Sequence, residues 1–205
     1  MMKKQLKLYL NKHSIYYILG LFILATGICL IIDSKLGASP WDLLCLGLYN
    51  KTGISVGTWQ IINNIVMIII TKGLFQKKWN FICLIPGVLL GLFIDIMYTY
   101  TSLITLPSMI SLMMGCMMSG LGLAIYIHQG LSANAIDNFM HSLQVYKRLS
   151  TGTSKIICDF IPISIILLLG IQLQIATILI YVLVPLWMQA FYKLLQMKPT
   201  LLVIT

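Results

Sequence analysis

Five aspartates supply all the acidic side chains of this 205-residue chain. Two of them stand at similar places: Asp42 follows Ser39 by three residues, and Asp137 follows Asn134 by three. His141 comes four residues after Asp137, which puts both on one face of a helix. Each carboxylate could cap the start of its own helix, in an arrangement that resembles a capping box. Alternatively, both could flank a polar cavity and bind a proton, a cation or a cationic solute.

Three further polar residues lie inside long apolar stretches. Asp95 stands in GLFIDIMYTY, and we expect the Tyr98 and Tyr100 hydroxyls to hold it near the outer membrane surface. Asp159 and Asn64 occupy two other apolar stretches. An ionisable group within a membrane span is a candidate for a functional site. For Asp159 and Asn64, hydrogen bonding between helices is the alternative interpretation.

The elements that must position these residues are membrane helices. The chain is 59% hydrophobic and 9% charged, with a mean hydropathy of +0.94, whereas soluble domains carry about 25% charged residues. A soluble or disordered protein is therefore excluded. Stretches of 18–22 residues cross the hydrocarbon core of a bilayer. Six qualify: 15–33, 55–72, 81–102, 109–128, 153–171 and 175–195.

Charge placement predicts the orientation. Of the 14 basic residues, 12 fall on one side if the N-terminus is cytoplasmic, and only Lys35 and Lys51 fall outside. We thus expect a multi-pass protein of a bacterial plasma membrane with both termini inside. The inside set consists of Lys3, Lys4, Lys7, Lys12, Lys72, Lys77, Lys78, Lys147, Arg148, Lys155, Lys193 and Lys198.

The motifs of enzymes and cofactor sites are absent from the sequence. The five cysteines are scattered, and no Ser-His-Asp pattern, HExxH or P-loop occurs. The basic residues form no stripe on a polar domain, which argues against nucleic acid binding. We therefore expect no enzyme, no cofactor and no metal. The expected partners are the lipid bilayer and a small solute.

The chain repeats itself at an offset of 95 residues. Eleven of the 36 positions from 27 to 62 are identical to those 95 residues later, among them Asp42 with Asp137 and Gly57-Thr58 with Gly152-Thr153. The single membrane domain, 1–205, thus divides into repeats at about 14–103 and 109–198. Each repeat has three spans, an odd number, so the second must cross the membrane in the opposite sense. Many secondary transporters are built this way.

Each repeat also carries a segment that is too short to span, with a predicted helix at 39–50 and at 134–146. Ser39 and Asn134 are suitable N-caps, and Pro40 suits the first helical turn, beside Trp41. Such paired segments point to transporter binding sites when they re-enter the membrane. They could equally lie flat at the two surfaces. We expect the Gly-Thr pairs that follow them to allow close helix packing.

The string LGASPWDLL at 36–44, followed by TGISVGT at 52–58, resembles the YczE/YyaS/YitT family of bacterial membrane proteins, and its YczE-like branch most. The resemblance covers about 20–200 and implies a membrane location and an all-helical fold, but no substrate. The chain departs from the family pattern at Asn134-Ala135, where a Gly-Pro pair is usual. It also departs at Asn80-Phe81, where Gly-Thr is expected.

Two functions from different classes follow from this pattern. A small-solute transporter or permease-like protein predicts that the paired aspartates face a cavity that water can enter. A scaffold or regulator of another membrane complex predicts a dry, packed core with its polar features at the surface.

Overall fold

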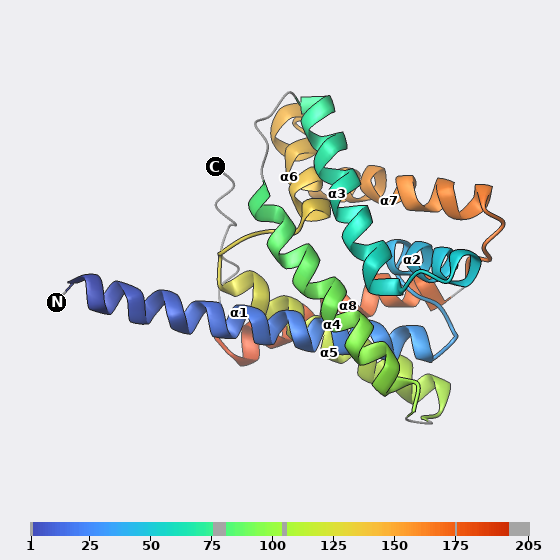
Figure 1. Ribbon diagram of the computed structural model, residues 1–205, viewed down its shortest axis with the longest axis horizontal. Coiled ribbons are helices and arrows are strands. Elements are labelled where there is room, and N and C mark those ends of the chain that lie inside the picture. The colour runs from blue at the N-terminus through green and yellow to red at the C-terminus, as the bar shows by residue number, and fades with distance from the viewer. Residues whose placement is uncertain (1, 76–80, 104–105, 175, 197–205) are drawn as a thin grey trace.

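The computed structural model describes residues 2–75, 81–103, 106–174 and 176–196, and the side chains among them except those of 2–11 and 151. Lys77, Lys78 and Lys198 lie outside the described residues. The described chain forms eight α-helices and one short 3-10 turn, η1 (Figure 1). Their bounds are α1 Met2–Asp33, α2 Pro40–Thr52, α3 Val56–Phe75, η1 Phe81–Cys83, α4 Leu84–Thr101, α5 Ser108–His128, α6 Ala135–Lys147, α7 Thr151–Leu168 and α8 Ala176–Leu194.

Five of the described helices are long and apolar enough to cross a bilayer. They cover Lys12–Asp33, Val56–Phe75, Phe81–Thr101, Ser108–His128 and Ala176–Leu194, in agreement with five of the six predicted spans. The remaining prediction, 153–171, corresponds to α7, an 18-residue helix with Lys155 and Asp159 in its first half. The all-helical fold and the multi-pass character are therefore confirmed.

Helices α1 and α5 pack closely against each other along a seam of small residues. A Cβ added to Gly27 would lie 2.5 Å from the Ser119 backbone nitrogen, and one added to Gly122 would lie 2.4 Å from that of Leu24. Glycine at these positions lets the two backbones approach, which stabilises helix pairs in membranes. The seam also holds a hydrogen bond from Ser111 Oγ to the Leu30 carbonyl at 2.8 Å.

The contacts of this seam are reciprocal under the offset of 95 residues. Gly27 corresponds to Gly122, and their neighbours Leu24 and Ser119 correspond to each other. A second set follows the same rule: Gly20 packs on Tyr126 and Gly115 packs on Ile31, with Gly20 equivalent to Gly115 and Ile31 equivalent to Tyr126. Each helix therefore presents the same positions to the other.

The two short helices match in length and at both ends. Helix α2 covers Pro40–Thr52 and α6 covers Ala135–Lys147, bounds that differ by 95 residues at each end. The side chain of Ser39 caps α2 by accepting from the Asp42 nitrogen, and that of Asn134 caps α6 by accepting from the Ile136 nitrogen. Both N-cap predictions are thus confirmed.

The ends of the short helices show where the repeats differ. Gly53 ends α2 at φ 74° and Arg148 ends α6 at φ 51°, so both adopt the left-handed conformation. That conformation costs a glycine little and costs an L side chain about 1–2 kcal/mol. Helix α6 therefore ends in the same left-handed turn as α2, although Arg148 favours that conformation less than glycine does.

Helices α3 and α7 begin with the same hydroxyl contact, but the surroundings of Gly57 and Gly152 differ. Ser55 bonds Thr58 at 2.7 Å and Ser150 bonds Thr153 at 2.9 Å, hydroxyl to hydroxyl. A Cβ on Gly57 would clash with the carbonyl oxygen of Gly91 in α4, whereas one on Gly152 would meet nothing within 4 Å. The expected close approach is therefore correct for Gly57, whereas no described residue approaches Gly152 in this way.

Candidate functional site

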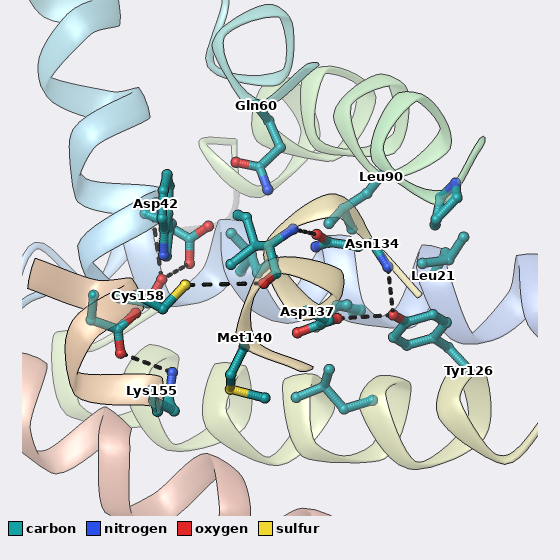
Figure 2. Close-up of a pocket in the computed structure, with 18 residues that line it drawn as sticks. Leu21, Asp42, Gln60, Leu90, Tyr126, Asn134, Asp137, Met140, Lys155 and Cys158 are labelled. Carbon is teal, nitrogen blue, oxygen red and sulfur yellow. Dashed lines mark hydrogen bonds and ion pairs between the residues drawn. The ribbon is translucent and has the colours of Figure 1, made fainter. Parts of the chain in front are cut away.

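The first turns of α2 and α6 meet at a cavity of about 180 Å³ inside the helical bundle (Figure 2). Both predicted aspartates line it, together with the two N-cap residues that precede them. Residues from seven helices, α1 to α7, and from the segments before α2 and α6 make up the wall: Leu21, Leu24, Ile28, Ser39, Trp41, Asp42, Gln60, Pro86, Leu90, Leu123, Tyr126, Asn134, Ile136, Asp137, Met140, Lys155, Cys158 and Asp159.

The Asp42 carboxylate is held by its own N-cap. Ser39 Oγ donates to Asp42 Oδ2 at 2.5 Å, while the Asp42 backbone nitrogen donates to Ser39 Oγ at 3.4 Å. The described donor to this carboxylate is therefore the Ser39 hydroxyl rather than a backbone N–H group. Asp42 itself is half-buried, and its exposed part belongs to the cavity.

The Asp137 carboxylate is held by a tyrosine from a neighbouring span. Tyr126 donates its hydroxyl proton to Asp137 Oδ2 at 3.1 Å and accepts from the Asn134 backbone nitrogen at 3.3 Å. Tyr126 is 2% exposed, and its ring packs edge-on against Tyr17. The sequence analysis missed Tyr126 because its repeat equivalent, Ile31, has no polar group.

A lysine that was counted with the basic residues of the cytoplasmic side lines this cavity. Lys155 is on the second turn of α7, and its Nζ is 3.0 Å from Asp159 Oδ2 and 4.9 Å from the ring centre of Tyr181. Counting charges on the two sides of a membrane does not predict which of them face a cavity, so this position of Lys155 was not predicted. The signal that could have found Lys155 is its spacing of four residues from Asp159 and its repeat equivalence to Gln60, which also lines the cavity.

A second cavity of about 230 Å³ adjoins the first. It shares Ser39, Asp42 and Lys155 with the first and extends along α1, α5 and α8 to Ser119 and Tyr181. Asp42 and Lys155 therefore stand at the boundary between two spaces.

Burial perturbs both paired carboxylates, which lie in helices outside the five candidate spans. It raises the pKa of Asp42 to about 6, against the opposing effects of the Ser39 hydrogen bond and the positive charge of Lys155. Burial also raises the pKa of Asp137, against the Tyr126 hydrogen bond and the same lysine. A carboxyl group with a pKa near 6 can gain or lose a proton close to neutral pH.

Asp159 also lines the cavity, whereas the predicted site residues Asp95, Asn64 and His141 do not. Asp95 lies on α4 and accepts from Ser55 Oγ at 2.6 Å and from the Gly57 nitrogen at 2.7 Å, so it holds the start of α3. The expected partners, Tyr98 and Tyr100, do not hold it in the described structure. A carboxylate at this position complements the positive end of the α3 dipole.

Asn64 and His141 also lie outside the cavity wall. Asn64 is fully buried, accepts from the Ala135 nitrogen at 3.3 Å and donates to the Gln60 carbonyl at 2.8 Å. It thereby fixes the first turn of α6 against α3, which is the expected interhelical role. His141 follows Asp137 by one helical turn, half-buried and away from the cavity. The side chains that converge are therefore Asp42, Asp137 and Asp159.

The comparisons with known proteins point to one family. A family described as "Family of unknown function (DUF6198)" matches residues 11–193. The chain belongs to this DUF6198 family. Two relatives from Bacillus subtilis (strain 168) agree with it. The "Uncharacterized protein YyaS" is 35% identical over 128 residues, which cover 60% of this chain and 64% of that protein. The "Uncharacterized membrane protein YczE" is 37% identical over 134 residues, covering 61% of this chain and 60% of that protein.

These matches confirm the resemblance to YczE and YyaS, and the five apolar helices agree with a multi-pass membrane location for this DUF6198 member. The matched regions span less than two thirds of either relative. No solved structure matches the chain. Neither relative's name states a substrate, so the cavity is the basis for a functional proposal.

Proposed function

We propose that this protein is a permease-like transporter that carries a small solute across the plasma membrane without changing it chemically. The observation that carries the proposal is the meeting of two acid-bearing helix starts, α2 and α6, at one cavity whose wall combines apolar and charged side chains (Figure 2). A scaffold or regulator would need a packed apolar core. Charged groups inside a membrane protein are costly and usually mark the path of an ion or solute.

The proposed architecture is six spans in two inverted repeats, with α7 as the fifth span. Three observations support it: the short helices have bounds 95 residues apart, their caps correspond, and α1 and α5 make reciprocal contacts. Reciprocal contacts are what a two-fold axis between the repeats would produce. We further propose that both termini are cytoplasmic, as the distribution of basic residues favours.

Within this architecture, α2 and α6 are proposed to be re-entrant half-helices. Helices lying flat at opposite surfaces would be separated by the thickness of the membrane. Here their first turns share one cavity, and Pro40, Trp41 and Ala135 are buried. Irregular backbone before a half-helix is tolerated at membrane depth where it lines a polar cavity.

A comparison of intracellular metabolites tests the function. Cells lacking the gene are complemented with the wild type, with Asp42→Asn plus Asp137→Asn, or with Asp33→Asn as the control. Asp33 ends α1 and does not line either cavity. We expect cells that express the double variant at a normal level to have the same concentration of at least one small solute as cells lacking the gene. Cells with Asp33→Asn should match those with the wild type. If the double variant behaves like the wild type, the cavity is not the transport site.

A further inference from the structure

The charges around the cavity are the reverse of those of the whole chain. The protein carries a net charge of +9, yet three of its five acidic residues, Asp42, Asp137 and Asp159, line this one space. Lys155 is the basic residue among the lining side chains that the structure describes. A surplus of buried carboxylates is costly unless positive charge or protons balance it.

The helix starts reduce this surplus without removing it. A helix N-terminus acts as roughly half a positive charge, so α2 and α6 together supply about one. The Lys155–Asp159 pair is neutral in sum. Against Asp42 and Asp137, the balance leaves about one negative charge in the cavity. One monovalent cation would neutralise it.

Lys155 shows what the cavity offers to an ammonium group. Its Nζ lies between the Asp159 carboxylate at 3.0 Å and the face of the Tyr181 ring at 4.9 Å. A carboxylate and an aromatic face are the two groups that bind ammonium ions best. The protein's own ammonium group therefore already occupies part of the space that a cationic solute would need.

The adjoining cavity adds a polar atom that lacks a partner. Ser119 is 3% exposed and lines this cavity, and its Oγ makes no hydrogen bond within the described structure. A buried hydroxyl without a partner is costly, and a bound ligand can satisfy it. Ser119 lies on α5, beyond the shared wall formed by Asp42 and Lys155.

The volume limits the size of the solute. About 180 Å³ corresponds to the liquid volume of about six water molecules, at about 30 Å³ each. We propose that the cavity binds a small solute with a protonated primary amine, with Asp42 and Asp137 as its counter-charges, and that Lys155 competes with it. This assignment of substrate class rests on the proposed transport function.

The test measures the melting temperature of the full-length protein, purified in detergent, in increasing concentrations of ethylammonium chloride. Sodium acetate and sodium chloride at equal ionic strength are the controls. A ligand that binds the folded state raises the melting temperature with concentration. We expect ethylammonium to raise the melting temperature of the wild type and the two sodium salts to leave it unchanged. If sodium acetate raises the melting temperature of the wild type, or if sodium chloride raises it as much as ethylammonium chloride does, the proposal is overturned without any variant.

Three variants then assign the roles. Asp42→Asn and Asp137→Asn should each raise the half-saturating ethylammonium concentration at least tenfold, while Asp33→Asn leaves it unchanged. Lys155→Gln introduces the residue found at the equivalent position of the other repeat, Gln60, and should lower that concentration severalfold. Loss of the response in Lys155→Gln would mean that Lys155 holds the ligand, and the proposal would fail.

Measurements of flux in proteoliposomes separate this inference from the proposed function. Uptake of a neutral or anionic solute, without any response to ethylammonium, would overturn the amine assignment and leave transport standing. A response to ethylammonium without uptake of radiolabelled ethylammonium would support the amine site and count against transport.

Discussion

At the scale of single residues, the same side chain type serves two purposes in this protein. Asp42 and Asp137 each accept one hydroxyl hydrogen bond and face a cavity. Asp95 accepts from both a hydroxyl and a backbone nitrogen and joins α4 to the start of α3. Two strong contacts within the protein leave Asp95 less available to a ligand, and we conclude that its role is structural.

Replacement of Asp95 by asparagine should therefore reduce stability and spare transport. The amide can keep one of the two hydrogen bonds but loses the negative charge, and hydrogen bonds to charged groups contribute about 1.5–3 kcal/mol. We expect a lower melting temperature in detergent, with the solute levels of complemented cells unchanged. Ser55→Ala, which removes one donor to Asp95, should shift the melting temperature in the same direction. An unchanged melting temperature with loss of the metabolite effect would identify Asp95 as a ligand-binding residue instead.

At the scale of elements, caps and hydrophobic length were sufficient to place the helices. Ser39 and Asn134 start α2 and α6 within one residue of the predicted 39 and 134, and both helices run slightly past their predicted ends. The approach of their first turns could not be predicted, because a repeat in the sequence does not locate the axis that relates its copies. For the same reason Lys155, which was counted on the cytoplasmic side, and Tyr126, which has an apolar equivalent, were not predicted as cavity residues.

The seam between α1 and α5 gives a prediction at this scale. Alanine at Gly27 or at Gly122 should destabilise the protein to a similar extent, because each added Cβ meets backbone 2.4–2.5 Å away across the same seam. Overpacking of this kind costs about 1–3 kcal/mol. Thermal unfolding in detergent and the yield of monodisperse protein measure the effect.

Gly73 provides the matched control for this pair. It lies within α3, and a Cβ at this position meets nothing within 4 Å. Because alanine favours a helix over glycine by about 1 kcal/mol, Gly73→Ala should be neutral or stabilising. A fall in the melting temperature as large as that of Gly122→Ala would show that the seam is not the reason for the loss.

At the scale of the whole molecule, the distribution of basic residues still argues for one orientation after Lys155 is set apart. Of the other 13 basic residues, 11 lie on the side proposed to be cytoplasmic. Because Lys155 lines the cavity, we set it apart from the count, and its removal leaves the bias intact.

Labelling of single introduced cysteines tests this orientation. Leu74 is 63% exposed and Leu103 is 76% exposed, whereas the five native cysteines are buried and should react slowly. A maleimide that cannot cross membranes should label Leu103→Cys in intact cells and label Leu74→Cys only after permeabilisation. Lys51→Cys, at the exposed end of α2, should behave like Leu103→Cys. The opposite pattern would reverse the proposed orientation.

The reciprocal seam between α1 and α5 forms only after a delay during biosynthesis, because its two helices are far apart in the sequence. Ser108, the first residue of α5, is made 75 residues after Asp33, the last of α1. At about 5–20 residues per second, α1 waits roughly 4–15 s in the bilayer before its partner emerges. During that interval Gly20 and Gly27 face lipid or the insertion machinery instead of α5. Helix α1 must therefore persist without α5 in the membrane, and premature release or degradation of the nascent chain competes with assembly during those seconds.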